Sequence, residues 1–158
     1  MDIKTHYDLL IEENNDPFRD PPVLQKYMET WDGQAFLDLM ELDESKTVLE
    51  IGVGTGRLAV KAAASCRHLT GIDISPKTIA RAKENLRDCQ NISLVCGDFL
   101  DYPFAETFDV IYSSLTMMHF DIHRFLPPSC PHSGSPEMNA AIFPAVISGV
   151  WFSVSMNS

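Results

Sequence analysis

The sequence predicts an α/β protein built on an open, doubly wound parallel sheet. Short apolar segments alternate with helical segments from Lys46 onward, which is the pattern of consecutive parallel βαβ units. The first of these segments, VLEIG, is almost entirely apolar, as expected for a strand in a sheet that helices cover on both faces. It runs directly into the glycine-rich stretch 52–56, at the end of a strand where such sheets bind ligands.

Residues 1–45 are expected to form a helical cap in front of the sheet. Asp20 stands before a proline, which is typical of an N-cap and a first helical residue. The spacing of apolar residues predicts short helices over residues 6–14, 22–31 and 34–42. The second of these helices places Tyr27, Met28 and Trp31 on one side.

Residues 46–126 are expected to form the core of the domain. Strands are predicted over residues 47–52, 68–75, 91–99 and 107–115. Helices are predicted over residues 55–65 and 75–88. Ser75 is the expected N-cap of the second of these helices, and Pro76 is its expected first residue.

Residues 127–158 form an atypical tail that is rich in proline and serine at first and then apolar. The stretch from Met138 to Ser158 contains no charged residue, and its β-branched and aromatic side chains suit an added strand. Its apolar part is shorter than the about 20 residues that a membrane-spanning helix needs, and no Lys or Arg flanks it. We therefore expect no membrane partner.

Composition narrows the classes of function. The chain has 158 residues and a net charge of −10, so binding to nucleic acid through charge is not expected. The four cysteines form no CxxC pair, which is typical of reduced thiols. The first residues carry acidic side chains and no long apolar stretch, so no secretory signal is expected and a cytoplasmic location is predicted.

The spacing of the glycines favours one kind of ligand over another. Gly52, Gly54 and Gly56 allow a tight turn and let the main chain approach a ligand closely. A dinucleotide-binding loop follows the pattern G-x-G-x-x-G, and this chain has Arg57 where the third glycine belongs. A nicotinamide dinucleotide is therefore disfavoured.

Acidic residues end three consecutive predicted strands. Asp73 is placed to accept hydrogen bonds from both hydroxyls of a ribose. Asp98 is placed to accept from an adenine amino group, with Phe99 packed near the ring. Glu50 lies two residues before the glycines, where it suits an ammonium group better than a pyrophosphate. This set fits an adenosine that carries a cationic amino-acid tail.

The segments VLEIGVGTGRLA, GIDISPKTIARAKENL and FDVIYSSLTMMHF, in this order, resemble the class I S-adenosylmethionine-dependent methyltransferases. The likeness covers about Val48 to Phe120 and implies a Rossmann-like sheet with strand order 3-2-1-4. The chain after the fourth strand resembles no part of that family. We therefore expect a fold that is incomplete relative to the seven-stranded family fold, truncated after strand four and followed by an unrelated tail. Strand four would be an exposed edge, so self-association through it or through the tail is possible.

The resemblance also implies S-adenosylmethionine as the cofactor and indicates which residues would hold it. The three glycines would line the methionine part, Asp73 would hold the ribose and Asp98 the adenine. The full set of expected cofactor residues is Glu50, Gly52, Val53, Gly54, Thr55, Gly56, Asp73, Ile74, Asp98, Phe99 and Ser113.

The acceptor of the methyl group is expected to be a small molecule. The segment YSSL after the fourth strand lacks the Asn-Pro-Pro-aromatic signature of relatives that methylate amides or adenine nitrogens, and the net acidity agrees. His119 is the candidate general base, because histidine titrates near neutral pH. Ser114 and a lid made by Tyr27, Met28 and Trp31 are the candidate substrate contacts. The same helical spacing also fits ordinary core packing.

The role of Arg57 is open, and the histidines and cysteine near the end of the chain do not predict a metal site. Arg57 either reaches the carboxylate of the cofactor or is a solvated helix residue. His119, His123, Cys130 and His132 are of types that bind zinc, but their spacing matches no standard zinc site, so no metal is expected.

The sequence therefore leaves three functions, in this order. The first is a methyltransferase that uses S-adenosylmethionine on a small-molecule acceptor. The second is a cofactor-binding fragment with little or no activity, because the walls of the acceptor pocket in this family usually include the half that the resemblance does not cover. The third is an NAD-dependent oxidoreductase.

Overall fold

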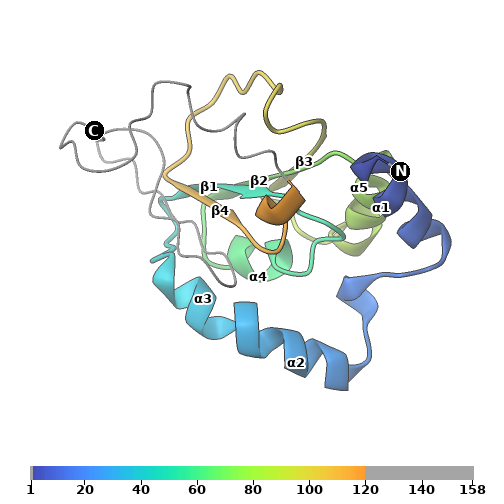
Figure 1. The fold of residues 1–158 in the computed structure, drawn as a ribbon. Helices are drawn as coiled ribbons and strands as arrows, with labels where there is room; N and C mark the ends of the chain where they lie inside the picture. Colours follow the sequence, from blue (N-terminus) through green and yellow to red (C-terminus); the bar gives the residue numbers. More distant parts are fainter. Residues whose placement is uncertain (1, 120–158) are drawn as a thin grey trace, which may run out of the picture.

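The computed structural model describes residues 2–119 of the chain. The strands are β1 (Thr47–Ile51), β2 (His68–Asp73), β3 (Ile92–Cys96) and β4 (Val110–Ser113). All neighbouring pairs are parallel, and the order is β3-β2-β1-β4 (Figure 1). The predicted α/β class, the parallel sheet and the order 3-2-1-4 are confirmed.

Two apolar layers hold the sheet, one on each face, because successive strand side chains point to opposite faces. Val48 and Leu69 belong to the larger cluster, which also takes in the helices α4 (Ala59–Ala63) and α5 (Pro76–Asn85). Leu49 and Ile72 belong to the smaller cluster, which is closed by aromatic side chains of the connection between β3 and β4. Within residues 2–119, helices therefore cover one face and a loop covers the other.

The helices of the core start where their residues allow it. Ser75 caps α5 as predicted, because its Oγ accepts a hydrogen bond from the Thr78 N–H at 3.0 Å. The prediction that a helix begins at Thr55 is wrong, since α4 begins only at Ala59. Gly54 and Gly56 both have positive φ, and this part of the chain forms a turn instead of a helix.

The N-terminal part contains α1 (Ile3–Glu12), the 3₁₀ turn η1 (Pro17–Arg19), α2 (Pro22–Asp32) and α3 (Gln34–Leu39). Figure 1 shows α1 beside α5 and α2 and α3 on the side of the sheet where α4 lies. Phe36 of α3 packs edge-on against Tyr112 of β4, with ring centroids 5.7 Å apart. The N-terminal helices therefore share the core of the sheet, and the boundaries predicted at residues 45 and 126 stay predictions.

Asp20 does not cap α2 as predicted. The N-cap of α2 is Pro21, which has no side-chain hydrogen bond to the helix, and the main-chain carbonyl of Asp20 instead accepts from Gln25 Nε2 at 2.8 Å. Across the described part of the chain, no helix has the length and apolar character needed to cross a membrane. The predicted tail and the residues His123, Cys130 and His132 lie outside the described residues.

Candidate functional site

A cleft of about 490 Å³ opens at the carboxyl ends of the strands. Its floor is the loop after β1, and its walls come from the segments that follow β2, β3 and β4. Ile3 and Tyr7 of α1 and Met28 of α2 complete it. Both the place and the size are those of small-molecule sites in open α/β sheets.

The loop after β1 presents bare main chain to this cleft. Gly52, Gly54 and Gly56 have φ angles of +73°, +56° and +94°. A Cβ on Gly52 would collide with Thr116, and one on Gly56 would collide with Leu86. A Cβ on Gly54, in contrast, would find no described atom within 4 Å. The φ of +56° favours glycine at position 54, but no side chain of the protein packs there, so the main chain of Gly54 is open to a ligand.

Asp73 stands at the end of β2 beside that loop. Its Oδ2 accepts from the Gly54 N–H at 3.1 Å, and its Oδ1 accepts from the Ser75 N–H at 3.0 Å. Burial raises the pKa of Asp73, and these two N–H groups oppose the effect. An ionised carboxylate has about four lone-pair sites, so after these two bonds about two remain, which suits two neighbouring hydroxyls.

The residues after β2 and β3 form the more apolar end of the cleft. Ile74, Phe99 and Leu100 line it, together with Asp98, whose Oδ1 accepts from the Leu100 N–H at 3.0 Å. The ring of Phe99 lies against that of Phe104, with centroids 6.2 Å apart. This combination of apolar surface with a carboxylate suits a flat ring that carries an amino group.

Glu50 is a buried acid at the floor of the cleft. It is 3% exposed, and the Tyr112 hydroxyl donates to its Oε2 at 2.7 Å. Burial raises the pKa of Glu50 to about 8, an effect that the Tyr112 hydrogen bond and the nearby Arg57 guanidinium reduce. Glu50 is therefore mostly protonated at neutral pH, and a cationic group beside it would favour its ionised form.

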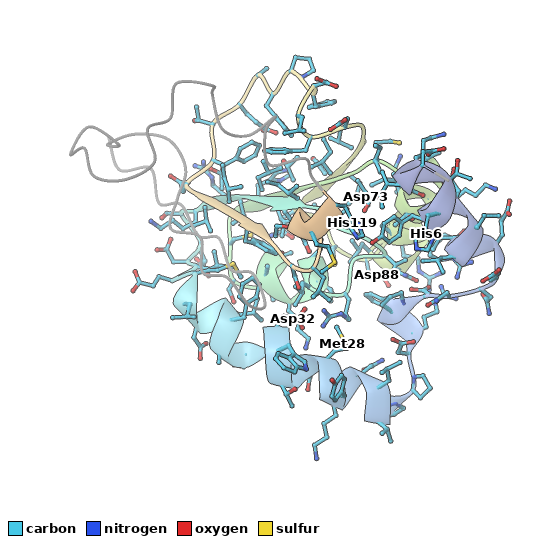
Figure 2. All side chains as sticks on the ribbon, viewed as in Figure 1. His6, Met28, Asp32, Asp73, Asp88 and His119 are labelled. Carbon is cyan, nitrogen blue, oxygen red and sulfur yellow. The ribbon has the colours of Figure 1, made fainter. Side chains whose placement is uncertain are left out.

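Two aromatic rings that line the cleft contact each other. The Tyr7 hydroxyl and His119 Nε2 are 2.9 Å apart, and the two rings meet edge-on with centroids 5.7 Å apart. Both residues line the cleft (Figure 2 labels His119). Burial, followed by the charge of Asp73, raises the pKa of Tyr7. The sequence predicts only a helix over residues 6–14 around Tyr7, because nothing local links two residues that are 112 positions apart.

Of the two predicted roles of Arg57, the solvated helix residue is wrong, and contact with the carboxylate of the cofactor stays a prediction. Its side chain is 17% exposed, so it is not solvated, and its guanidinium pairs with Asp32. Asp32 also accepts from the Ser114 hydroxyl at 2.7 Å. Arg57 and Ser114 line the cleft, and Asp32 lies behind them. The sequence carried no signal for Asp32 as a site residue.

Three predicted site residues lie elsewhere. Tyr27 and Trp31 are 59% and 58% exposed and do not line the cleft, so the predicted aromatic lid is wrong. Met28 is turned the other way and does line it (Figure 2). Ser113 is buried outside the cleft, while its neighbour Ser114 lines it, because successive residues at the end of a strand face opposite sides.

The other predicted cofactor residues come together. Among the expected set, those that line the cleft are Glu50, Gly52, Val53, Gly54, Thr55, Asp73, Ile74, Asp98 and Phe99. Gly56 lies in the same loop with its Cα packed toward Leu86. Among residues 2–119, no group of three or more His, Cys, Asp or Glu side chains could hold a metal ion.

Comparison with known proteins identifies a family. A family model described as a methyltransferase domain matches residues 48–127, which is half of the chain. An uncharacterized methyltransferase from Staphylococcus carnosus (strain TM300) is 33% identical over 113 residues, covering 72% of this chain and 49% of the relative. A probable dimethyladenosine transferase from Dictyostelium discoideum is 33% identical over 86 residues, covering 51% of this chain and 26% of the relative.

Solved structures share the fold. The DhpI–SAH complex superimposes with a TM-score of 0.60 at 21% identity, covering 77% of this chain and 55% of that one. Phosphoethanolamine N-methyltransferase 1 from Haemonchus contortus, in complex with phosphoethanolamine and S-adenosylhomocysteine, gives a TM-score of 0.58 at 24% identity, covering 63% of this chain and 22% of that one. The chain spans about half or less of the length of the curated relatives named above. The predicted truncation after strand four stays a prediction.

Proposed function

Because the chain belongs to the class I methyltransferase family, whose cofactor is S-adenosylmethionine, we propose that it binds this cofactor in the cleft and methylates a small-molecule acceptor. The observation that carries the proposal is the bare main chain at Gly54, which faces open space directly beside Asp73. Each chemical part of the cofactor has a counterpart among the residues that line the cleft.

The residues present fit this cofactor. Gly54 leaves room for a ligand against the loop, and Asp73 keeps acceptor sites for a ribose. Ile74 and Phe99, with Asp98 beside them, suit an adenine ring. Glu50 suits the ammonium group at the other end. Among residues 2–119, no lysine lines the cleft where a pyrophosphate would need one, which agrees with the disfavoured dinucleotide.

The cofactor supplies a methyl group already activated on a positively charged sulfur, so the protein's task is mainly to position the acceptor and exclude water. Tyr7 and His119 both line the cleft and contact each other. His119 is the candidate to take a proton from the acceptor as it is methylated. Tyr7 holds one ring nitrogen of His119 and so fixes the orientation of the ring.

The acidity of the chain supports a small acceptor. Some relatives carry names that refer to adenosine or ribosomal RNA, such as the Ribosomal RNA small subunit methyltransferase A of Syntrophus aciditrophicus. A net charge of −10 opposes binding to an RNA backbone, and the 490 Å³ cleft is of a size for a small molecule beside part of the cofactor.

Isothermal titration calorimetry with S-adenosylmethionine, S-adenosylhomocysteine and NAD tests the proposal. We expect the first two to bind and NAD not to bind. Gly54→Ala adds one methyl group in the open space and should weaken binding by about tenfold or more. Because alanine is strained at a φ of +56°, the melting temperature without ligand should fall by about 2–8 °C. Binding of NAD alone, or equal affinities in the variant, would refute the proposal.

Turnover is measured separately from binding. Release of S-adenosylhomocysteine is followed with a panel of small amines, alcohols and thiols, and in parallel with ribosomal RNA. Turnover with a small acceptor supports the enzyme, and turnover only with RNA overturns the choice of acceptor. Binding without any turnover would favour the cofactor-binding fragment instead.

A further inference from the structure

One part of the cleft wall is held by three residues that lie far apart in the sequence. Asp32 ends α2, Arg57 follows the glycine loop and Ser114 follows β4. Asp32 Oδ2 accepts from the Arg57 guanidinium and, at 2.7 Å, from the Ser114 hydroxyl. Figure 2 shows Asp32 and Met28 on the side of α2 that faces the sheet. One carboxylate therefore ties three separate segments of the wall together.

Stability alone is a weak explanation for this acid. Asp32 is 4% exposed, and its Oδ1 has no hydrogen-bond partner among residues 2–119. A buried ion pair pays a desolvation cost that an apolar pair of similar volume avoids, and an unpartnered carboxylate oxygen adds to that cost. The neighbouring ion pair between Glu29 and Lys61 joins the same part of the molecule without burial. A buried acid at this position therefore calls for a reason other than holding α2 in place.

The ion pair fixes the position of Arg57 at the cleft. An arginine side chain is long and flexible, but this one is 17% exposed and is held through Nη2 by Asp32. A guanidinium has five N–H donors in a planar fork, so donors remain for a ligand beyond the contact with Asp32. Arg57 lines the cleft near Glu50, which is mostly neutral, so Arg57 supplies the positive charge at this end.

We propose that Asp32 is a positioning residue that holds the Arg57 guanidinium in place to bind the carboxylate of the cofactor's amino-acid end. The inference rests on the proposed function. Ser114 takes part because its hydroxyl donates to Asp32, which leaves the lone pairs of its oxygen as acceptors. The end of the cleft near the glycine loop thus offers a cation for a carboxylate, and acceptor groups at Ser114 and Glu50 for an ammonium group.

The test compares two ligands that differ only in the carboxylate, S-adenosylmethionine and its decarboxylated form, by calorimetry on the full chain. The wild-type protein should prefer the carboxylate-bearing ligand by about tenfold or more, as expected for a charge-assisted hydrogen bond. Asp32→Ala and Arg57→Met should both remove this preference while keeping the affinity for the decarboxylated ligand. Asp32→Asn retains an acceptor for Arg57 and Ser114 and should give an intermediate preference.

Glu29→Ala is the matched control, because it removes the exposed ion pair with Lys61 from the same helix. It should leave the preference unchanged. If the role of Asp32 is merely structural, Asp32→Ala should weaken the binding of both ligands equally. A stronger preference for the carboxylate-bearing ligand in that variant would show that Asp32 only screens the charge of Arg57. Either result overturns the inference. If the wild-type protein binds both ligands equally, the inference fails while the proposed function stands; if it binds neither, the proposed function itself fails.

Discussion

Glu50→Gln is the change whose effect on stability follows most directly from the structure. Glu50 is 3% exposed, and burial raises its pKa from 4.5 to about 8. In the unfolded chain the same carboxyl loses its proton near its ordinary pKa. Between these two values the folded protein holds one proton more than the unfolded chain. The free energy of unfolding therefore falls as the pH rises through this interval.

The magnitude follows from the size of the shift. For each pH unit in which Glu50 is protonated only in the folded state, the free energy of unfolding falls by up to about 1.4 kcal/mol. Over the whole interval it falls by up to about 5 kcal/mol. This loss of stability is absent below the pKa that Glu50 has in the unfolded chain, and it is complete above pH 8. Glutamine keeps the shape and an oxygen that accepts from the Tyr112 hydroxyl, but it does not titrate. The variant should therefore gain stability relative to the wild-type protein as the pH rises from 5 to 8.

Urea unfolding followed by circular dichroism, at pH values from 5 to 9 and without ligand, measures this difference. Other titrating groups act on both proteins, so only the difference between the two curves reports on Glu50. Equal dependence on pH in both proteins would refute the assignment of a buried, protonated Glu50.

Three further changes test other parts of the site. Asp73→Ala should weaken binding of S-adenosylmethionine in calorimetry by about 1.5–3 kcal/mol if the carboxylate holds the ribose, and an unchanged affinity would contradict that role. Tyr7→Phe keeps the ring but loses the contact with His119, so steady-state kinetics should show kcat lowered roughly fivefold with a shifted pH profile and little change in KM for the cofactor; an unchanged kcat and profile would exclude this role. Asp16→Ala removes a buried acid that pairs with Arg81 at 3.2 Å, so thermal unfolding should show a loss of about 3 kcal/mol, and a loss below 1 kcal/mol would count against that pair.

Much of the fold follows from local patterns in the sequence. Apolar strands alternating with helices predict the parallel sheet, and Ser75 followed by Pro76 predicts the start of α5 correctly. Most of the residues that line the cleft sit at or directly after strand ends, so a motif such as VLEIGVGTG locates Glu50 and Gly54 without a structure. Such features depend on neighbours in the chain, which a sequence displays.

The orientation of a helix and its long-range contacts cannot be predicted from neighbouring residues in the sequence. The apolar stripe of α2 suggested that Tyr27 and Trp31 face the cleft, but the inward side of α2 carries Met28 and Asp32. The ion pair with Arg57 supplies a contact on that side, and it joins residues 25 positions apart. The prediction that Met28 shares a side with Tyr27 and Trp31 is also wrong, because Met28 lines the cleft and the two aromatic residues are exposed. Only tertiary contacts decide which part of the helix surface turns inward.

A crystal structure of the protein grown with S-adenosylhomocysteine would test the central claim most directly. We predict that the nucleoside lies in the cleft, with its amino-acid end against the main chain of Gly54 and its ribose hydroxyls on Asp73. A cleft filled by the protein's own side chains, or a nucleoside bound away from Gly54 and Asp73, would contradict it.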